Sequence, residues 1–355
     1  MQNLFIRKFL ANKFFWFYLL SGGFVLCTAL LGILVSSVSV PVPHIFYIII
    51  NNTFNTLSYE DIAPNVEMII WNIRLPRVLL AFFVGASLAL AGAAFQGLLR
   101  NPLADPYTIG VSSGASLGAV IVLFFSISIS GLGTFTLPVF AIAGGFAALL
   151  VVFGLVRLSS RSLAIETIIL AGIIVSAFIS SIVSLIIALG DRDSMTQIIY
   201  WLYGSVGMRG WSHVQLIIPF MIIGTVILLK HYRELNALAL GEDSAENIGV
   251  NVTRGKTWIL IGASLLTGSA VAVSGAIGFV GLVIPHLVRL VTGPNHMHVL
   301  PLSMFTGGAF LILADLLART IIAPKELPIG VITALIGAPV FAFLLIRERL
   351  GRRGG

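Results

Sequence analysis

The sequence predicts an all-α integral membrane protein, a polytopic bundle of about ten transmembrane helices. Of its 355 residues, 58% are hydrophobic and only 10% are charged, and the mean hydropathy is +1.04. A soluble globular domain carries about 25% charged residues, so this chain could not cover its apolar surface in water. A bilayer supplies the apolar solvent that the composition requires. No hydrophilic stretch is long enough for a second domain, so residues 1–355 are expected to form a single transmembrane domain.

The expected spans follow from the length of the apolar stretches, because about 20 apolar residues cross a bilayer as a helix. A helix is the only local structure that satisfies the backbone of such a segment internally. The spans are 14–38, 76–99, 108–127, 135–157, 164–189, 211–230, 256–275, 278–292, 299–321 and 328–346. The first of them is too long for the apolar core of a signal peptide, so we expect it to remain uncleaved.

The expected orientation follows from lysine and arginine, which favour the cytoplasmic side of short loops. With ten spans, one side receives Arg7, Lys8, Lys13, Arg157, Arg161, Arg347, Arg349, Arg352 and Arg353. The other side receives Glu60, Asp61 and Glu67. We therefore expect a multi-pass protein of the plasma (inner) membrane, with both termini in the cytoplasm.

Residues that could carry chemistry form no catalytic or metal-binding pattern. A lone cysteine excludes an intramolecular disulfide and a Cys-based metal cluster, and Cys27 is expected to be a small buried hydrophobe. His296 and His298 are close together, but their spacing does not suit a metal site on a helix, so we expect loop histidines. We find no nucleophile beside a base, and therefore expect no enzyme activity, cofactor or metal.

The sequence pattern also excludes two further functions for this chain, which are ATP hydrolysis and nucleic-acid binding. Residues 249–257 resemble a phosphate-binding loop, but Gly249 and Gly255 enclose five residues, whereas that loop requires four and a preceding strand. Any ATP must therefore be hydrolysed by a partner chain. The net charge of +7 is not arranged as a basic stripe interleaved with aromatic residues, so no nucleic-acid partner is expected.

Several motifs occur together after residue 70. They are RLPRVLLAFFVGASLALAGAAFQGLLRNPLADPYTIGVSSGA (74–115), LALGEDSAENIGVNV (238–252), GAIGFVGLVIPHLVRL (275–290), ADLLAR (314–319) and ELPIGVITALIGAPVFAFLL (326–345). In these blocks and their order the chain resembles the FecCD family of permeases, which serve cobalamin, haem and ferric siderophores.

The resemblance implies a type II ABC importer permease fold. It also implies the membrane-spanning subunit of an ATP-binding-cassette importer that translocates a metal chelate. The implied partners are ABC ATPase subunits, an extracytoplasmic substrate-binding protein, a second permease subunit (identical or a paralogue) and membrane lipid. The cargo itself is left open.

A polar break separates the second and third spans, because Pro102 and Pro106 interrupt any helix there. A structural turn would explain it, whereas the resemblance implies that Asn101 and Leu103 form a cytoplasmic gate. The family's second gate element precedes the fifth span. There this chain reads Ala-Ile-Glu-Thr at 164–167 rather than small hydroxyl residues, so that element does not carry over.

Small residues recur every four positions in the fifth span, at Gly172, Ser176, Ser180 and Ser184. This spacing places them on one helix face. Such a face favours close helix packing, and as a polar strip it could equally line a translocation path.

The segment 231–255 is the longest polar stretch between spans. Gly241 is expected to divide two short helices, and Gly249 to end the second. The resemblance implies that residues 234–250 couple to the ATPase. The residues to which the resemblance assigns this coupling role are Leu238, Leu240, Gly241, Glu242, Ala245, Ile248 and Gly249. Apolar residues in a polar segment favour docking onto another protein.

Three arginines, Arg74, Arg77 and Arg319, fall near the outer surface, against the usual bias. Anchoring to lipid phosphate or an internal partner could explain them, since Asp315 could pair with Arg319 as i,i+4. The resemblance implies instead that the three receive glutamates of the binding protein. Asp315 and Arg319 also keep open the alternative of an ion-coupled secondary transporter, which requires buried ionisable groups. A membrane-embedded enzyme, the other alternative, lacks a catalytic constellation.

Overall fold

The computed structural model describes residues 13–36, 40–54, 62–159 and 164–353, without the side chains of Leu345 and 347–353. All regular elements within these ranges are helical. They are α2 (Lys13–Leu34), α3 (Val42–Phe54), α4 (Pro64–Met68), η1 (Ile69–Arg74), α5 (Leu75–Leu98), η2 (Pro106–Ile109), α6 (Val111–Phe124), η3 (Gly133–Phe135), α7 (Thr136–Ser159), α8 (Ile165–Leu189), α9 (Arg192–Leu202), α10 (Gly210–Lys230), α11 (Tyr232–Leu238), α12 (Glu242–Asn247), α13 (Val252–Ser274), α14 (Val280–Thr292), α15 (His296–Thr320) and α16 (Ile329–Arg353).

The expected helical membrane bundle is confirmed. In the described ranges, 7 helices are long and apolar enough to cross a bilayer, and α6, α14 and most of α16 are shorter apolar helices. These ten helices coincide with the ten expected spans to within a few residues. Sequence reasoning missed α3 and α9, which have only 13 and 11 residues and are too short to read as spans.

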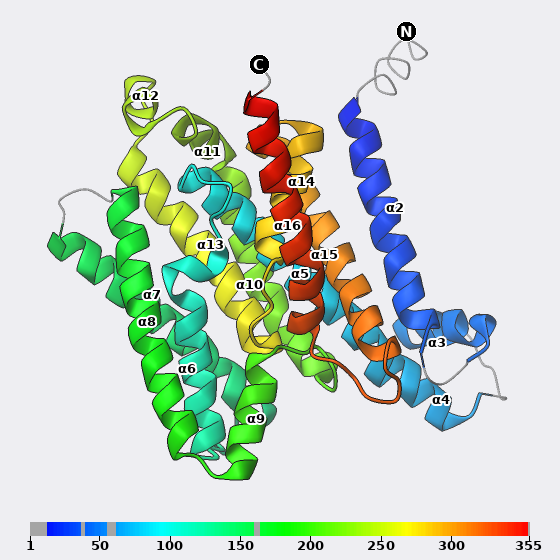
Figure 1. The fold of residues 1–355 in the computed structure, drawn as a ribbon. Coiled ribbons are helices and arrows are strands. Elements are labelled where there is room, and N and C mark those ends of the chain that lie inside the picture. The colour runs from blue at the N-terminus through cyan, green and yellow to red at the C-terminus, as the bar shows by residue number, and fades with distance from the viewer. Residues whose placement is uncertain (1–12, 37–39, 55–61, 160–163, 354–355) are drawn as a thin grey trace, which may run out of the picture.

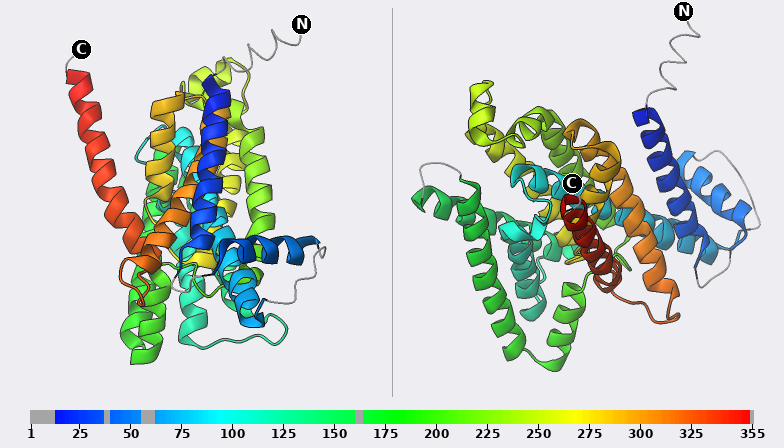
Figure 2. Two further views of the ribbon diagram at one scale, coloured as in Figure 1. Left: turned by 90° about the vertical axis from the view of Figure 1, so that its right-hand side faces the viewer. Right: turned by 45° about the horizontal axis from the view of Figure 1, so that its top comes forward.

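The bundle has two distinct ends (Figure 1). The start of α2 and the end of α16 lie at the same end as α11 and α12, which we call the proximal end. Helices α3, α4 and α9 lie at the opposite, distal end, where α3 runs across the bundle axis (Figure 2). The charged residues Arg7, Lys8, Glu60, Asp61 and Arg161 lie outside the described residues.

Helix α5 is the centre of the bundle. In the continuous helix Pro64–Leu98, 83% of the most apolar window is buried, against 17% in α2 and 33% in α7, α8 and α10. It packs against α13, α14 and α15. A Cβ atom at Gly92 would lie only 1.9 Å from the carbonyl oxygen of Gly281 in α14. Small residues therefore let these helices approach closely.

Peripheral helices expose apolar side chains, as expected of helices that face lipid. Leu185 on α8 and Leu20 on α2 are 59% and 66% exposed. Cys27 is also exposed, so the expectation of a buried cysteine was wrong. The physical reason is that α2 lies at the edge of the bundle and buries few of its residues.

Candidate functional site

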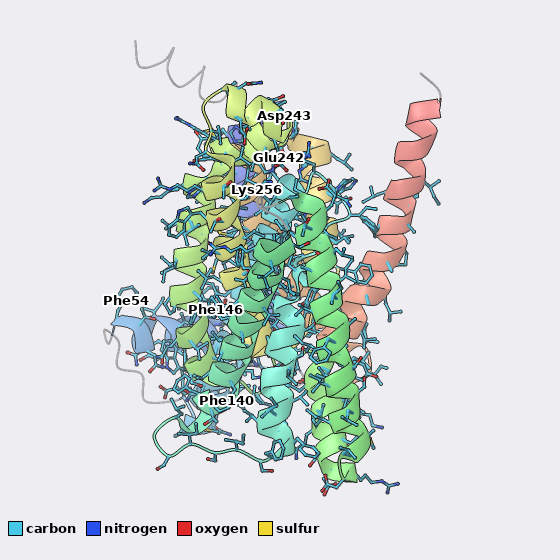
Figure 3. The ribbon with its side chains drawn as sticks, turned by 90° about the vertical axis from the view of Figure 1, so that its left-hand side faces the viewer. Phe54, Phe140, Phe146, Glu242, Asp243 and Lys256 are labelled. Carbon is cyan, nitrogen blue, oxygen red and sulfur yellow. The ribbon has the colours of Figure 1, made fainter. Side chains whose placement is uncertain are left out.

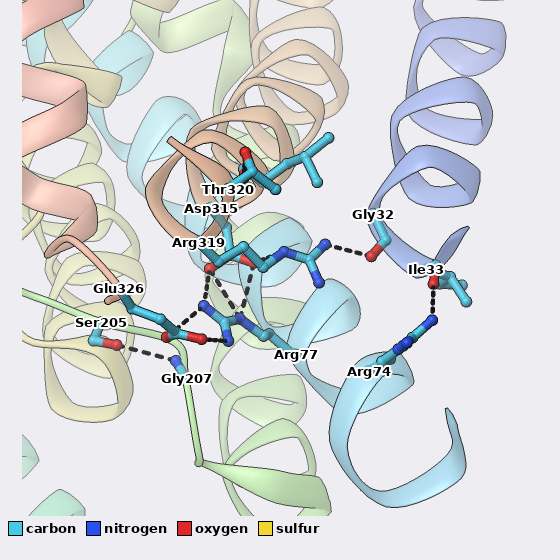
Figure 4. A network of polar contacts seen from close by, with 11 residues as sticks. Gly32, Ile33, Arg74, Arg77, Ser205, Gly207, Asp315, Arg319, Thr320 and Glu326 are labelled. Atoms are coloured by element: carbon cyan, nitrogen blue, oxygen red, sulfur yellow. Dashed lines mark hydrogen bonds and ion pairs between the residues drawn. The ribbon is translucent and has the colours of Figure 1, made fainter. Parts of the chain in front are cut away.

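The three arginines Arg74, Arg77 and Arg319 line one cavity at the distal end. Arg74 and Arg77 are three residues apart in a continuous helix, and Arg319 lies in the last turn of α15. Packing of α5 against α15 brings them together around a cavity of about 270 Å³, which Glu326 also lines. We call Arg74, Arg77, Asp315, Arg319 and Glu326 the arginine cluster (Figure 4).

Arg77 holds two carboxylates at once. Its Nε donates to both oxygens of Asp315 at 3.0 Å, and its Nη2 donates to Asp315 Oδ1 at 2.9 Å. Its Nη1 and Nη2 donate to the two oxygens of Glu326 at 2.8 and 3.0 Å. The forked guanidinium suits this double pairing, whereas a lysine could not reproduce it. The side chains of Arg77 and Asp315 are only 10% and 2% exposed.

The other two arginines bind the end of α2. Arg74 Nη1 donates to the carbonyl oxygen of Ile33 at 3.1 Å, and Arg319 Nη2 donates to that of Gly32. The last carbonyls of a helix lack partners within it, and a positive charge there also complements the helix dipole. The arginines thus tie α2 to α5 and α15 and are not simply displayed to solvent.

The expected pair of Asp315 and Arg319 exists, but it is the lesser contact. Arg319 Nε lies 3.7 Å from Asp315 Oδ2, whereas Arg77 donates hydrogen bonds to both oxygens of Asp315. The hydrogen bond from Arg77 also lowers the pKa of Glu326. With three guanidinium groups and two carboxylates, the cluster keeps one positive charge in excess.

The proximal end carries the expected pair of short helices, α11 and α12. Gly241 lies between them with φ of +116°, and Gly249 follows α12 with φ of +86°. Glu242 and Asp243 stand in the first turn of α12, where the helix dipole favours negative charge. The division of this segment was therefore predicted correctly.

The apolar residues of this segment divide into two groups. Leu240 and Ile248 are 74% and 66% exposed. Leu238 and Ala245 are buried at 1% and 0% exposure, inside the core of the chain itself. Only Leu240 and Ile248 are therefore positioned to meet a partner, while Leu238 and Ala245 hold the segment in place. We call residues 234–250, which are expected to couple to the ATPase, the coupling segment.

Side-chain contacts attach the coupling segment to α13 and α15. Lys256 of α13 is 1% exposed and pairs with Glu242 of α12, with Nζ 2.5 Å from Oε2 (Figure 3). Asn236 of α11 accepts a hydrogen bond from the His296 backbone N–H at the start of α15, at 2.9 Å. A Cβ at Gly241 would lie 3.7 Å from Arg100 Nη1, so α12 begins beside the polar break after α5.

The polar break itself lies at 99–105, as expected. Asn101 Oδ1 accepts a hydrogen bond from the Leu103 backbone N–H at 2.9 Å, and the Leu103 side chain is 44% exposed. Asp105 caps η2 by accepting from Tyr107 N at 3.0 Å, and burial raises the pKa of Asp105 to about 6. A gate role for Asn101 and Leu103 stays a prediction.

The small-residue strip of α8 is divided along its length. A Cβ at Gly172 would lie 2.5 Å from the Thr108 carbonyl oxygen, so this residue packs against η2. Ser176 is partly buried, whereas Ser180 and Ser184 are exposed. Close packing thus explains the proximal part of the strip, and a path-lining role for the exposed part stays a prediction.

Histidines lie in different positions from those expected. His296 and His298 belong to the first turn of α15 and not to a loop, because Asn295 caps this helix by accepting from Met297 N. His296 is 2% exposed and its Nδ1 contacts Asn236 Oδ1 at 2.9 Å. Within the described ranges, no group of three or more His, Cys, Asp or Glu residues could hold a metal ion.

Sequence reasoning missed two functional candidates, Glu326 and Lys256. Glu326 opens the block ELPIG, but its partner Arg77 is 249 residues away. Lys256 follows the coupling segment closely, and a lysine at the start of an apolar span is a signal that could have indicated a buried ion pair with Glu242. Both ion pairs form only when the helices pack together, so a local sequence pattern does not reveal them.

Comparison with known proteins gives consistent relatives. The ABC transporter permease protein YvrB of Bacillus subtilis (strain 168), described as uncharacterized, is 51% identical over 354 residues, which are 99% of this chain and 99% of that protein. The hemin transport system permease protein HmuU of Yersinia pestis is 44% identical over 289 residues, which are 80% of this chain and 85% of that protein.

A solved structure agrees with the fold. A metal-chelate type ABC transporter in an inward-facing conformation matches with a TM-score of 0.78 and 34% sequence identity, over 92% of this chain and 97% of that chain. A model of the FecCD transport family matches residues 24–347. The chain is thus a multi-pass membrane protein, and it belongs to the FecCD transport family.

Proposed function

We propose that the chain is the membrane-spanning permease subunit of an ATP-binding-cassette importer for a metal chelate. A substrate-binding protein delivers the chelate at the distal end, which faces outward. ATPase subunits act at the proximal end, which faces the cytoplasm. Two permease subunits, identical or paralogous, enclose the path between them. Membership of the family and the resemblance to a metal-chelate transporter support this proposal.

The observation that carries the proposal is the coupling segment. It exposes Leu240, just after α11, and Ile248, just after α12, whereas Leu238 and Ala245 of these two short helices are buried. An exposed apolar pair on a structured polar segment is typical of a protein–protein contact. The same segment contacts α13 and α15, and Gly241 lies close to the Arg100 side chain, so a movement of the ATPase would reach Asn101 and Leu103 by a short route.

The arginine cluster supports docking of the binding protein, although its arginines are not freely exposed. Arg74 and Arg77 are too well buried to protrude as free docking groups. A carboxylate of the binding protein would enter the cavity beside Glu326, whose side chain is 48% exposed. The excess positive charge of the cluster favours this entry, and the incoming carboxylate would compete with Glu326 for Arg77.

The alternative of an ion-coupled secondary transporter finds no support in the geometry. Its candidates, Asp315 and Arg319, lie at the distal end of α15 and are engaged with Arg77 and Gly32. A carboxylate held by an arginine fork has little tendency to bind and release a proton or cation during each cycle.

The experiment that tests the proposal is reconstitution of defined components. The purified chain alone should hydrolyse no ATP, and vesicles should accumulate a chelate only when the cognate ATPase, the binding protein and ATP are all present. Accumulation driven by a sodium or proton gradient without the ATPase would favour the secondary transporter. ATP hydrolysis by the highly purified chain alone would contradict the proposal that only the ATPase subunits hydrolyse ATP.

A further inference from the structure

A second cavity, of about 500 Å³, lies next to the arginine cluster at the distal end. Its walls come from α9, the loop between α9 and α10, the adjoining ends of α6 and α7, and the residues before α16. The polar and aromatic residues that line it are Gln197, Tyr200, Trp201, Ser205, Arg209 and Glu326. Glu326 lines both cavities and so separates them.

Arg209 differs from Arg77 and Arg319 because its guanidinium has no acidic partner in the described residues. Its Nε is buried without a hydrogen bond, and no ion pair in the described part of the chain includes it. Burial lowers the pKa of Arg209, with no opposing contribution from a carboxylate. A partly desolvated cation without a partner is costly, and a bound anion would remove that cost.

The wall that carries Arg209 is fixed by backbone hydrogen bonds to two other segments. Ser205 N donates to the carbonyl oxygen of Ser274 at 2.7 Å, beside the end of α13. Ile329 N and Gly330 N, at the start of α16, donate to the carbonyl oxygens of Gly204 and Tyr203 at 3.1 and 3.2 Å. The cavity is therefore a constructed feature and not a gap beside a loose loop.

The lining chemistry narrows the ligand class. Arg209 is a cation, and Trp201 is 6% exposed with an Nε1–H that has no acceptor in the described residues. The only acid in the wall, Glu326, is already engaged by Arg77. Tyr200, Trp201 and the leucines 123, 137 and 327 add aromatic and apolar surface. A volume of this size is typical of small-molecule sites, which span about 300–1,000 Å³.

We propose that this cavity is an outer binding site for the cargo. It takes an anionic metal chelate with a flat apolar face, whose carboxylate binds Arg209 while the face packs on Tyr200 and Trp201. Arg209 thereby selects anionic over neutral chelates. This inference rests on the proposed function, because it requires the distal end to be the side from which cargo enters.

The test compares two ligands that share one ring and differ in the charge of their two acid groups. Hemin carries two carboxylates on a flat ring, and its dimethyl ester has the same ring without them. Each is titrated by Soret absorbance into the permease in lipid nanodiscs, with empty nanodiscs subtracted for partition into lipid. We expect the wild type to bind hemin about tenfold more tightly than the ester, which corresponds to about 1.4 kcal/mol.

Variants assign the preference to its residue. Arg209→Gln should remove the difference between hemin and the ester, and Arg209→Lys should retain part of it because the charge remains. Lys325→Gln, which changes an exposed cation at the same end outside the cavity, should retain all of it. Thermal stability of each variant, measured in parallel, identifies any that fail to fold.

Three results would overturn the inference. The first is no hemin binding by the wild type above empty nanodiscs, and the second is an unchanged preference in a folded Arg209→Gln variant. The third is an equal loss of the preference for hemin in a Glu326→Gln variant. That result would mean that Arg209 serves as an alternative partner of Glu326 and does not bind the carboxylate of the ligand. The titrations contain no ATPase, binding protein or ATP, so their failure is distinct from failure of the importer proposal.

Discussion

At the distal end, the arginine cluster keeps charged groups away from water, whereas at the proximal end the coupling segment keeps large apolar groups in it. Arg77 and Asp315 are 10% and 2% exposed, but Leu240 and Ile248 are 74% and 66% exposed. Buried charged groups are unusual in proteins, but the carboxylates of the arginine cluster are paired with Arg77 inside the chain. Leu240 and Ile248 have no comparable contact within the described part of the chain, which favours a contact with another protein.

The two regions differ in how they would meet a partner. The arginine cluster satisfies its charges internally and keeps one positive charge in excess, so an incoming carboxylate must compete with Glu326. The coupling segment has no such internal competitor, because Leu240 and Ile248 gain contacts only when another protein covers them. We therefore expect charge substitutions at the distal end to tune docking, and substitutions at the proximal end to disconnect the partner.

The largest effect on stability is expected from Asp315→Asn. This change leaves Arg77 with a single acid and removes the ion pair of Arg319. Breaking a buried pair by removing one partner costs roughly 3–5 kcal/mol. A thermal unfolding curve of the purified protein should show a clearly lower midpoint, and Asp193→Asn, an exposed acid at the same end, should show none. Equal midpoints would mean that the cluster does not hold α5 and α15 together.

The corresponding change at the proximal end is Lys256→Met. Glu242 keeps 30% of its side chain exposed, so water compensates it in part and the cost should fall below about 3 kcal/mol. The main effect should be on function, because α12 would lose its attachment to α13 and the ATP hydrolysed per chelate transported should rise. Lys230→Met, an exposed lysine at the same end, should leave that ratio unchanged. A wild-type ratio in Lys256→Met would remove this pair from the coupling route.

A smaller effect is expected from Glu326→Gln, which should strengthen docking of the binding protein. Removing the internal competitor raises the excess charge of the cavity, so the binding protein should dock a few-fold more tightly, mostly at low salt. Surface plasmon resonance at two ionic strengths would measure it, with Asp193→Asn as the control. Weaker docking in this variant would show that Glu326 is itself part of the docking surface.

The smallest effect is a pH dependence from the same residue. Arg77 lowers the pKa of Glu326 from its ordinary value of 4.5, so the folded state binds its proton less readily than the unfolded state. The stabilisation is thus present above about pH 5 and is lost as the pH falls through the lowered pKa. The unfolding midpoints of the wild type and Glu326→Gln should differ near pH 7 and approach each other as the pH falls below 4.5. A difference that does not change with pH would contradict the pairing.

The sequence predicted the helices better than the contacts between them. Apolar length alone located ten spans, and Gly241 with Gly249 correctly divided the coupling segment, because both signals are local. The partner of Asp315 could not be found in the same way. The i,i+4 rule pointed to Arg319, whereas Arg77, 238 residues away, makes the stronger contact once α5 and α15 pack.

The local sequence pattern also did not show which residues are buried. Leu238 and Leu240 are two residues apart and chemically identical, but one is in the core and the other in solvent. Cys27 was assigned to the core by residue type, and the peripheral place of α2 exposes it. Which face of a helix is buried depends on where its neighbours lie, and in an apolar membrane sequence the hydrophobic pattern carries little of that information.

The measurement that most directly tests the central proposal is the number of chelates transported per ATP hydrolysed in vesicles that contain the permease and its ATPase. Leu240→Asp places a charge where an apolar contact with the ATPase is expected, and Glu246→Gln changes an exposed residue of the same helix pair as a control. We expect uptake by Leu240→Asp to fall at least tenfold, equivalent to about 1.4 kcal/mol or more, while the protein inserts normally and Glu246→Gln transports like the wild type. Wild-type uptake and an unchanged ratio in Leu240→Asp would contradict the assignment of residues 234–250 as the coupling segment.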